Sequence, residues 1–243
     1  MNHAVLASSL QEILTMQNDT SNTIDSAKLE SEVRDTVAQG DNVQESVQRL
    51  TLKALSSEIH DLASLRRVIT AVMRGARDGV QQKLQQTTSQ TNAAKIQMTD
   101  AIAGLDAALA QLAEASKLAV EEAASRARKF SNEELTRARS DLESLEAMFL
   151  ETLQSSASTA KGLVADTLHD LVTHAKLNGT AVGSQLQDTL TTFTQQMTST
   201  GQSQLESGVK LTHATSDLLR KIAAGVLGGL AERVKPGEKH QSS

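Results

Sequence analysis

The chain has 243 residues and a net charge of −5 at neutral pH, and it contains no cysteine, tryptophan or tyrosine. The absence of cysteine excludes disulfides, thiolate metal ligands and cysteine nucleophiles, and it is compatible with a reducing compartment. Aromatic side chains supply the largest buried areas in protein cores, so a chain with three phenylalanines as its only aromatic residues does not suit a compact enzyme with a deep pocket. The negative charge disfavours nucleic-acid binding.

The remaining composition favours long, uninterrupted helices. The only proline is Pro236, close to the end of the chain, and proline breaks helix interiors. The rest is rich in Ala, Gln, Glu, Ser and Thr, and helices of this kind are stable only when their apolar faces pack on something. We therefore predict an all-α protein of elongated amphipathic helices, in a coiled-coil or helical-bundle architecture.

Residues 1–23 are predicted to form a short amphipathic helix followed by a loose polar linker. The apolar residues of the helix share one face: Val5, Leu6, Leu10, Ile13 and Leu14. The segment lacks the basic start and the long apolar core of a secretory signal. No window of the chain reaches the roughly 18 apolar residues of a membrane span, so we expect no transmembrane segment.

Residues 24–84 are predicted to contain short helices. Gly40 is placed to end the first of them, because glycine is common just past a helix C-terminus. The third helix is expected to end near Gly75 to Gly79, where two glycines interrupt its apolar pattern. The run 85–92, which has no large apolar residue, is predicted to be a linker.

Residues 93–154 are predicted to form long helices with a capped restart at Ser131. Ser131 and Glu134 have the spacing of a capping box, in which each side chain bonds the other residue's backbone N–H. The helix that follows carries one apolar stripe: Leu135, Ala138, Leu142, Leu145, Phe149 and Leu153. Because its spacings of three and four are close to those of a coiled-coil seam, we assign its central residues to self-association: Leu142, Leu145 and Phe149.

Residues 159–234 follow a weak point at 155–159 and are predicted to form a long helical rod. Apolar residues recur there in an eleven-residue repeat, about 3.67 residues per turn, which keeps them on one face with little supercoil. Sixty helical residues would extend roughly 90 Å. We assign the clearest part of this stripe to binding a surface or a partner: Val182, Leu186, Leu190, Phe193 and Met197.

The end of this region is more apolar, over residues 222–231. Within it Gly225 and Gly229 form a Gly-x-x-x-Gly pair, a spacing that lets helices approach closely. About ten residues make only half a membrane span, so we assign the pair to self-association, with an interfacial anchor as the alternative. Residues 235–243 are predicted to be a disordered tail.

Candidate catalytic and metal-binding patterns are weak. The sequence lacks the Gly-x-Ser-x-Gly nucleophile motif and the phosphate-binding glycine loops. Asp166 with His169, and Asp170 with His174, can each place an oxygen and a nitrogen on one helix face, but the Glu-x-x-His motif of di-iron bundles does not occur. We therefore expect no catalytic residues, no metal site and no cofactor.

Three stretches resemble an uncharacterised bacterial family of helical proteins: residues 114–130, the helix from Phe130 to Leu153, and residues 174–183. The likeness covers roughly residues 24–195, and it implies a helical fold without implying an activity. More loosely, the chain is similar to phasins, the amphipathic helical proteins that coat polyhydroxyalkanoate granules in bacteria. That similarity rests on the Ala-, Gln- and Thr-rich composition and the lack of cysteine, and it implies an association with granules.

Together these features predict a non-enzymatic structural or interaction protein of the bacterial cytoplasm. Its amphipathic helices would coat a hydrophobic surface, such as a storage granule or the surface of a membrane, and bury apolar area there. The alternative is a self-associating coiled-coil scaffold with no lipid or polymer ligand. We expect a homo-oligomer in either case, and no nucleic-acid partner.

Overall fold

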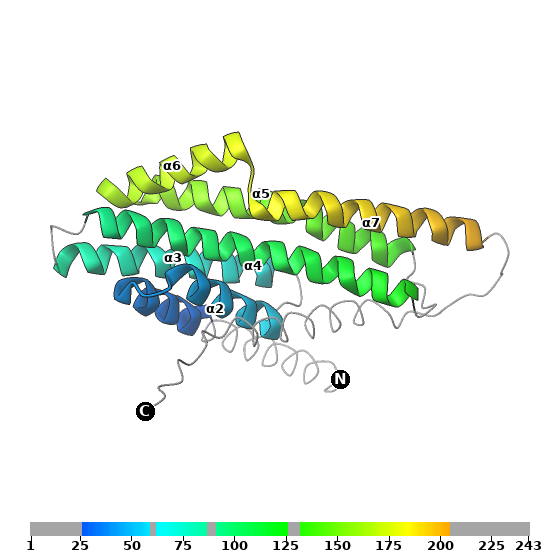
Figure 1. Ribbon diagram of the computed structural model, residues 1–243, viewed down its shortest axis with the longest axis horizontal. Helices are drawn as coiled ribbons and strands as arrows, with labels where there is room; N and C mark the ends of the chain where they lie inside the picture. The colour runs from blue at the N-terminus through cyan, green and yellow to red at the C-terminus, as the bar shows by residue number, and fades with distance from the viewer. Residues whose placement is uncertain (1–25, 59–61, 87–90, 126–131, 205–243) are drawn as a thin grey trace, which may run out of the picture.

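The computed structural model describes residues 26–58, 62–86, 91–125 and 132–204. Every element in these ranges is an α-helix, which confirms the predicted all-α class. A helical segment over residues 26–39 precedes the labelled helices. These are α2 (Val43–Glu58), α3 (Leu62–Gln86), α4 (Thr91–Ser125), α5 (Asn132–Thr159), α6 (Gly162–Asn178) and α7 (Ala181–Gln204). Figure 1 shows an elongated bundle with α4 along its middle.

The N-terminal layer, which we define as residues 26–39 together with α2, α3 and α4, is held by unusually close helix contacts. A methyl group at Gly75 of α3 would collide with the backbone carbonyl oxygen of Glu30, and one at Gly79 with that of Arg34. Glycine permits such an approach because it has no Cβ. The backbones of α3 and of residues 26–39 therefore lie in direct contact.

The prediction that the third helix ends near Gly75 to Gly79 is wrong, because α3 continues through both glycines to Gln86. Glycine at these positions serves helix packing and does not stop the helix. The corresponding prediction for Gly40 is confirmed. Gly40 follows the helical segment with a φ of 85°, and its N–H donates to the carbonyl of Thr36 at 3.1 Å.

The C-terminal layer, which we define as α5, α6 and α7, lies along the other side of α3 and α4 (Figure 1). α5 runs in one direction, and α6 and α7 return beside it. The weak point predicted at 155–159 is wrong, because α5 is helical to Thr159. There the hydroxyl of Ser158 donates to the carbonyl of Gln154 one turn earlier. The chain leaves the helix at residues 160–161 instead.

The long rod predicted for residues 159–234 is interrupted in its described part. α6 ends at Asn178 and α7 begins at Ala181. Between them Gly179 adopts a φ of 80°, a conformation that favours glycine, and its N–H donates to the carbonyl of Ala175 at 2.9 Å. The apolar repeat therefore runs along two shorter helices that are separated by this break.

One hydrophobic core joins the two layers. Its largest fully buried side chains come from both of them: Leu52, Leu55, Ile69, Met73, Met98, Leu105, Leu109, Leu135, Leu145, Phe149, Leu153 and Phe193. On α4 the commonest buried residue is alanine. The core therefore combines large aliphatic and aromatic side chains with the buried alanines of the central helix.

Several predictions fall outside the described ranges. They concern residues 1–23, the capping box at Ser131, the pair Gly225 and Gly229, and residues 235–243. Across the helices that the structure does describe, none has the combined length and apolarity that crossing a membrane requires.

Candidate functional site

The stripe assigned to surface binding faces the inside of the bundle. Val182 and Phe193 are fully buried, and Leu186 is 5% exposed. Leu190 and Met197 are partly buried and pack against the same core. The helix that carries them, α7, packs on α4 and α5. In the closed bundle this stripe therefore contacts α4 and α5 and is covered by the chain itself.

The residues assigned to self-association on α5 are covered in the same way. Leu142, Leu145 and Phe149 are all buried in the common core. α5 packs on α6 and α7 and also on α3, whereas α7 packs on α4 and α5. The second predicted self-association element, Gly225 with Gly229, lies outside the described residues.

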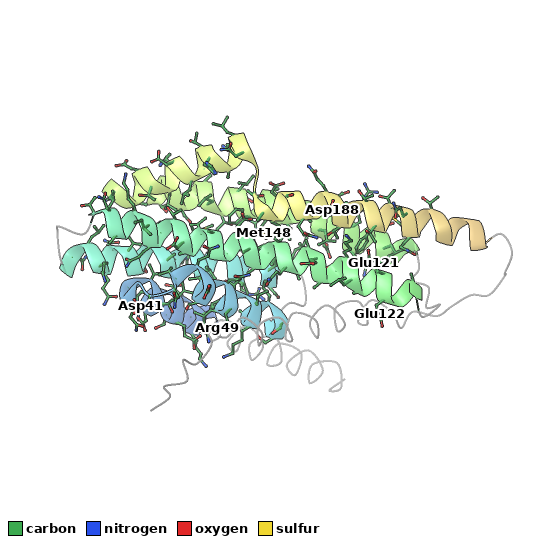
Figure 2. The ribbon with its side chains drawn as sticks, viewed as in Figure 1. Asp41, Arg49, Glu121, Glu122, Met148 and Asp188 are labelled. Atoms are coloured by element: carbon green, nitrogen blue, oxygen red, sulfur yellow. The ribbon has the colours of Figure 1, made fainter. Side chains whose placement is uncertain are left out.

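The outer surface of the described helices is polar. Figure 2 shows charged side chains such as Asp188, Glu121 and Glu122 on the outside, whereas Met148 lies within the bundle. Three large apolar side chains are exposed in this part of the chain: Ile96, Leu118 and Leu177. Most large apolar side chains of the described helices are therefore enclosed within the bundle.

A group of polar residues holds α7 where the chain breaks between α6 and α7. The carboxylate of Asp106, on α4, accepts the backbone N–H of Ala181 through Oδ2 at 2.8 Å and that of Val182 through Oδ1 at 3.0 Å. These are the first two residues of α7, whose N–H groups have no partner within the helix. Asp106 therefore caps α7 from a neighbouring helix and ties the two layers together.

Thr180 caps the same helix from its own chain position. Its hydroxyl accepts the N–H of Gly183 at 2.9 Å, which is the bonding of an N-cap residue, and donates to Oε1 of Glu146 at 2.7 Å. Glu146 belongs to α5, so this contact lies within the C-terminal layer. We call Asp106, Glu146 and Thr180, with the N–H groups of residues 181–183, the α7 clasp.

The clasp contains two carboxylates, and the charge of Glu146 acts on Asp106. Burial raises the pKa of Asp106 above its ordinary value of 3.8, and the negative charge of Glu146 raises it further. The hydrogen bonds from Val182 and Ala181 act in the opposite direction, because they stabilise the ionised carboxylate. Ionised Asp106 therefore carries a free-energy cost in the closed bundle that it would not carry in water.

Two other polar contacts join the layers. On the surface, Nη1 of Arg66 on α3 lies 3.0 Å from Oε2 of Glu151 on α5. Inside, the hydroxyl of Thr189 on α7 lies 3.2 Å from the carbonyl of Ala113 on α4. These contacts and the Asp106 cap are spread along the layer contact and hold it in one register.

The histidines considered as metal ligands bond to their own helix. Nδ1 of His169 lies 2.8 Å from the carbonyl oxygen of Ala165, and Nδ1 of His174 lies 3.0 Å from the Asn178 amide nitrogen. Both side chains are exposed. Within the described part of the chain, no group of three or more His, Cys, Asp or Glu side chains is arranged to hold a metal ion.

A shallow depression of about 400 Å³ lies between the first helical segment and α3. It is lined by Arg34, Asp35, Asp78, Gln81, Gln82 and Gln85. Arg34 pairs with Asp35 at 2.9 Å, so part of its charge is already neutralised. The depression offers amides and paired charges, without a nucleophile placed beside a base.

Sequence reasoning missed the clasp, although two signals of it were present. Asp106 is the only charged residue between Ala101 and Ala113, and apart from Gln111 the other residues of this stretch are apolar or small. Thr180 follows Gly179 directly, which is the order of a helix end followed by a helix cap. No sequence signal connects these two positions, because they are joined only by the packing of α4 on α7.

Comparison with known proteins gives a family and no activity. A family model matches residues 19–236, nearly the whole chain, and its description is "Family of unknown function (DUF6781)". This agrees with the predicted resemblance to an uncharacterised helical family. No curated protein and no solved structure matches the chain.

Proposed function

Since the chain belongs to the DUF6781 family of unknown function, no relative supplies an activity, and we propose that it is a non-enzymatic interaction protein that coats a hydrophobic surface. The proposed surface is that of a storage granule in the bacterial cytoplasm, which phasins also coat. In this proposal the closed bundle is the unbound state. Binding separates the C-terminal layer from the N-terminal layer and lays α5 and α7 on the surface.

The observation that carries the proposal is that the apolar stripes of α5 and α7 are buried in the same core. Phe149 on α5 and Phe193 on α7 are both buried in the hydrophobic core that the two layers share. If the layers separate, α5 and α7 present their apolar residues side by side as one face. Their opposite faces are polar, with Asp188 and Glu151 exposed. An antiparallel helix pair of this kind suits an interface between water and an apolar phase.

The free energy of opening is moderate because an apolar surface can replace α4 as the cover. Burial of a Leu or Phe side chain stabilises by about 1.5–3 kcal/mol, and this contribution is restored when the side chain is covered again. The exposed pair of Arg66 and Glu151 contributes about 0–1 kcal/mol. The Thr189 hydroxyl also lies 2.9 Å from the carbonyl of Gln185 in its own helix, so it stays hydrogen-bonded after release.

The N-terminal layer is the part we expect to stay folded. Gly75 and Gly79 place α3 directly against the backbone of residues 26–39. Nζ of Lys83 on α3 also donates to the carbonyl of Ala38 at 3.1 Å. The surface cannot supply such close backbone contacts, so separating these helices would not be compensated. The plane between the two layers is therefore the favoured plane of opening.

A cross-link between the layers tests this proposal. Arg66 and Glu151 are exposed, face each other across the layer contact, and can be replaced by cysteine in a chain that has none. A short bismaleimide with a cleavable spacer would then join α3 to α5. The binding assay is co-flotation with polyhydroxybutyrate particles and with phosphatidylcholine vesicles. We expect the cross-link to reduce binding by about tenfold or more, because it removes the binding-competent state, and cleavage to restore it.

The matched control is a cross-link within the C-terminal layer. Nη1 of Arg139 on α5 lies 3.4 Å from Oγ1 of Thr194 on α7, so a cysteine pair at these positions joins the two helices that are proposed to bind together. This cross-link should leave flotation unchanged. If the uncross-linked chain floats with neither particle and light scattering shows a fixed oligomer, the surface-coating proposal fails and the self-associating scaffold replaces it.

A further inference from the structure

The α7 clasp has a property that surface coating alone does not require. In its interlayer hydrogen bonds the first backbone N–H groups of α7 donate to one half-buried carboxylate, that of Asp106. Gly179, with its φ of 80°, lies two residues before Ala181, so the chain can change direction there. The hydrogen bonds between α4 and the start of α7 therefore lie next to this glycine and are accepted by a single titratable side chain.

The charge surroundings of Asp106 are one-sided. Each helix packed against α4 carries charged or titratable groups, among them the following: Glu45 and Arg49 on α2, Arg67 and Arg74 on α3, Glu146 on α5, His174 and Lys176 on α6, and Asp188 on α7. Of these, Glu146 is the one whose charge acts on Asp106. Nζ of Lys176 lies 3.1 Å from Oε1 of Gln154. The neighbouring charge that acts on Asp106 is thus a second carboxylate, and it disfavours the ionised form of Asp106.

Separation of the layers changes this environment. In the closed bundle the carboxylate of Asp106 is half-buried and faces Glu146, whereas in the open state it is exposed to water and Glu146 leaves with α5. The open state therefore accommodates an ionised Asp106 more easily than the closed state does. A protonated Asp106 has no charge to desolvate, so protonation favours the closed state.

We propose that Asp106 is a proton-dependent latch, which holds the C-terminal layer closed when it is protonated and favours its release when it is ionised. Opening of the bundle then increases as the pH rises and Asp106 ionises. This inference rests on the proposed function, since it assigns a regulation to the same opening. It concerns how strongly the closed state of the free chain is favoured over the open one, so it can be tested without any surface.

Spin labels on introduced cysteines measure the opening directly. Glu114 on α4 and Gln187 on α7 are both exposed and lie in different layers. The closed state predominates in the free chain, because no surface covers α5 and α7 there, and we expect a minor component at longer distance to grow as the pH rises and Asp106 ionises. A second pair, Lys53 on α2 and Glu114, lies within the N-terminal layer and should not change.

Three variants distinguish a role of Asp106 as a proton-dependent latch from a role as a helix cap that does not respond to pH. Asp106→Asn should abolish most of the pH dependence of the interlayer distance, because the side chain no longer titrates. Glu146→Gln should keep an acceptor for Thr180 and shift the distribution towards the closed state at neutral pH. Asp100→Asn is the matched control on α4, where burial also raises the pKa of the carboxyl. It should leave the interlayer distances as in the original chain.

The outcomes distinguish the latch from the coating function. An interlayer distance that keeps its full pH dependence in Asp106→Asn overturns the latch, and so does a Glu146→Gln chain that opens as the original does. Either result leaves the proposed function intact if the particles still bind. Distances that follow the prediction, in a chain that binds neither particles nor vesicles, support the latch and overturn surface coating.

Discussion

Oδ2 of Asp106 lies 2.8 Å from the backbone nitrogen of Ala181, a residue 75 positions further along the chain. This hydrogen bond joins the middle of the central helix to the first turn of α7. It gives the N-terminus of α7 an acceptor that its own sequence does not provide, and it places a carboxylate where the helix dipole favours negative charge. Several measurable consequences follow from its surroundings.

The first prediction concerns the second carboxylate of the clasp. Glu146→Gln removes a negative charge facing Asp106 and keeps an oxygen that can accept the Thr180 hydroxyl. We expect the free energy of unfolding at neutral pH to rise, by up to about 1 kcal/mol as for other partly exposed charge pairs. Glu143→Gln is the control, because Glu143 pairs with Arg139 at 2.7 Å and its loss should slightly lower stability. Urea denaturation of both variants measures the difference.

The pH dependence of stability should carry the signature of raised carboxyl pKa values. Burial raises the pKa of Asp106 and of Asp100 above 3.8, so the folded state binds these protons more tightly than the unfolded state does. Their stabilising contribution is fully present below pH 3.8 and is lost as the pH rises through the raised values. Asp106→Asn should therefore show a smaller decrease of stability towards neutral pH than the original chain. An identical pH profile of the unfolding midpoint would contradict the assignment.

Leucine truncation distinguishes the buried stripe from the surface. Leu186 is 5% exposed and Leu177 is 78% exposed. Leu186→Ala should destabilise the free chain by about 2–5 kcal/mol, because it removes buried methyl groups and leaves a cavity. Leu177→Ala should change stability by no more than about 0.5 kcal/mol. Equal effects of the two changes would show that the stripe does not face the core in the unbound protein.

The close contact at Gly75 predicts whether replacing this glycine by alanine raises or lowers the stability of the chain. In an open helix, replacing glycine by alanine stabilises by about 1 kcal/mol. At Gly75 the new methyl group would meet the carbonyl of Glu30, so Gly75→Ala should instead destabilise by about 1–3 kcal/mol. At Gly183 the methyl group would meet the side-chain carboxylate of Glu146, which can rotate away, so Gly183→Ala should cost less. Thermal unfolding of both variants ranks the two contacts.

The double change Leu186→Glu with Phe193→Glu is unsuitable as a test of surface binding. Both positions are buried in the closed bundle, so two carboxylates there would unfold the chain before any surface is offered. Loss of flotation would then report on stability. The cross-link between positions 66 and 151 avoids this problem, because it leaves every buried residue unchanged.

Local pattern determined the helical class, the apolar face of each helix and the ending of a helix at Gly40, because spacing along the chain sets which side chains share a face. The stripe from Leu135 to Leu153 is accordingly one buried face of α5. The same reasoning failed at Gly75, where close contact with another helix outweighed the tendency of glycine to end its own. Sequence spacing contains no information about which backbone approaches a given residue.

Tertiary structure alone decided what covers each apolar face. The residues from Val182 to Met197 form a stripe by sequence, but only the packing of α7 on α4 and α5 shows that the chain covers it itself. The capping role of Asp106 has the same origin, since its partners stand 75 and 76 positions away. Helix periodicity depends on neighbours within a few residues, whereas burial and the pKa of a carboxylate depend on whatever the fold brings near it.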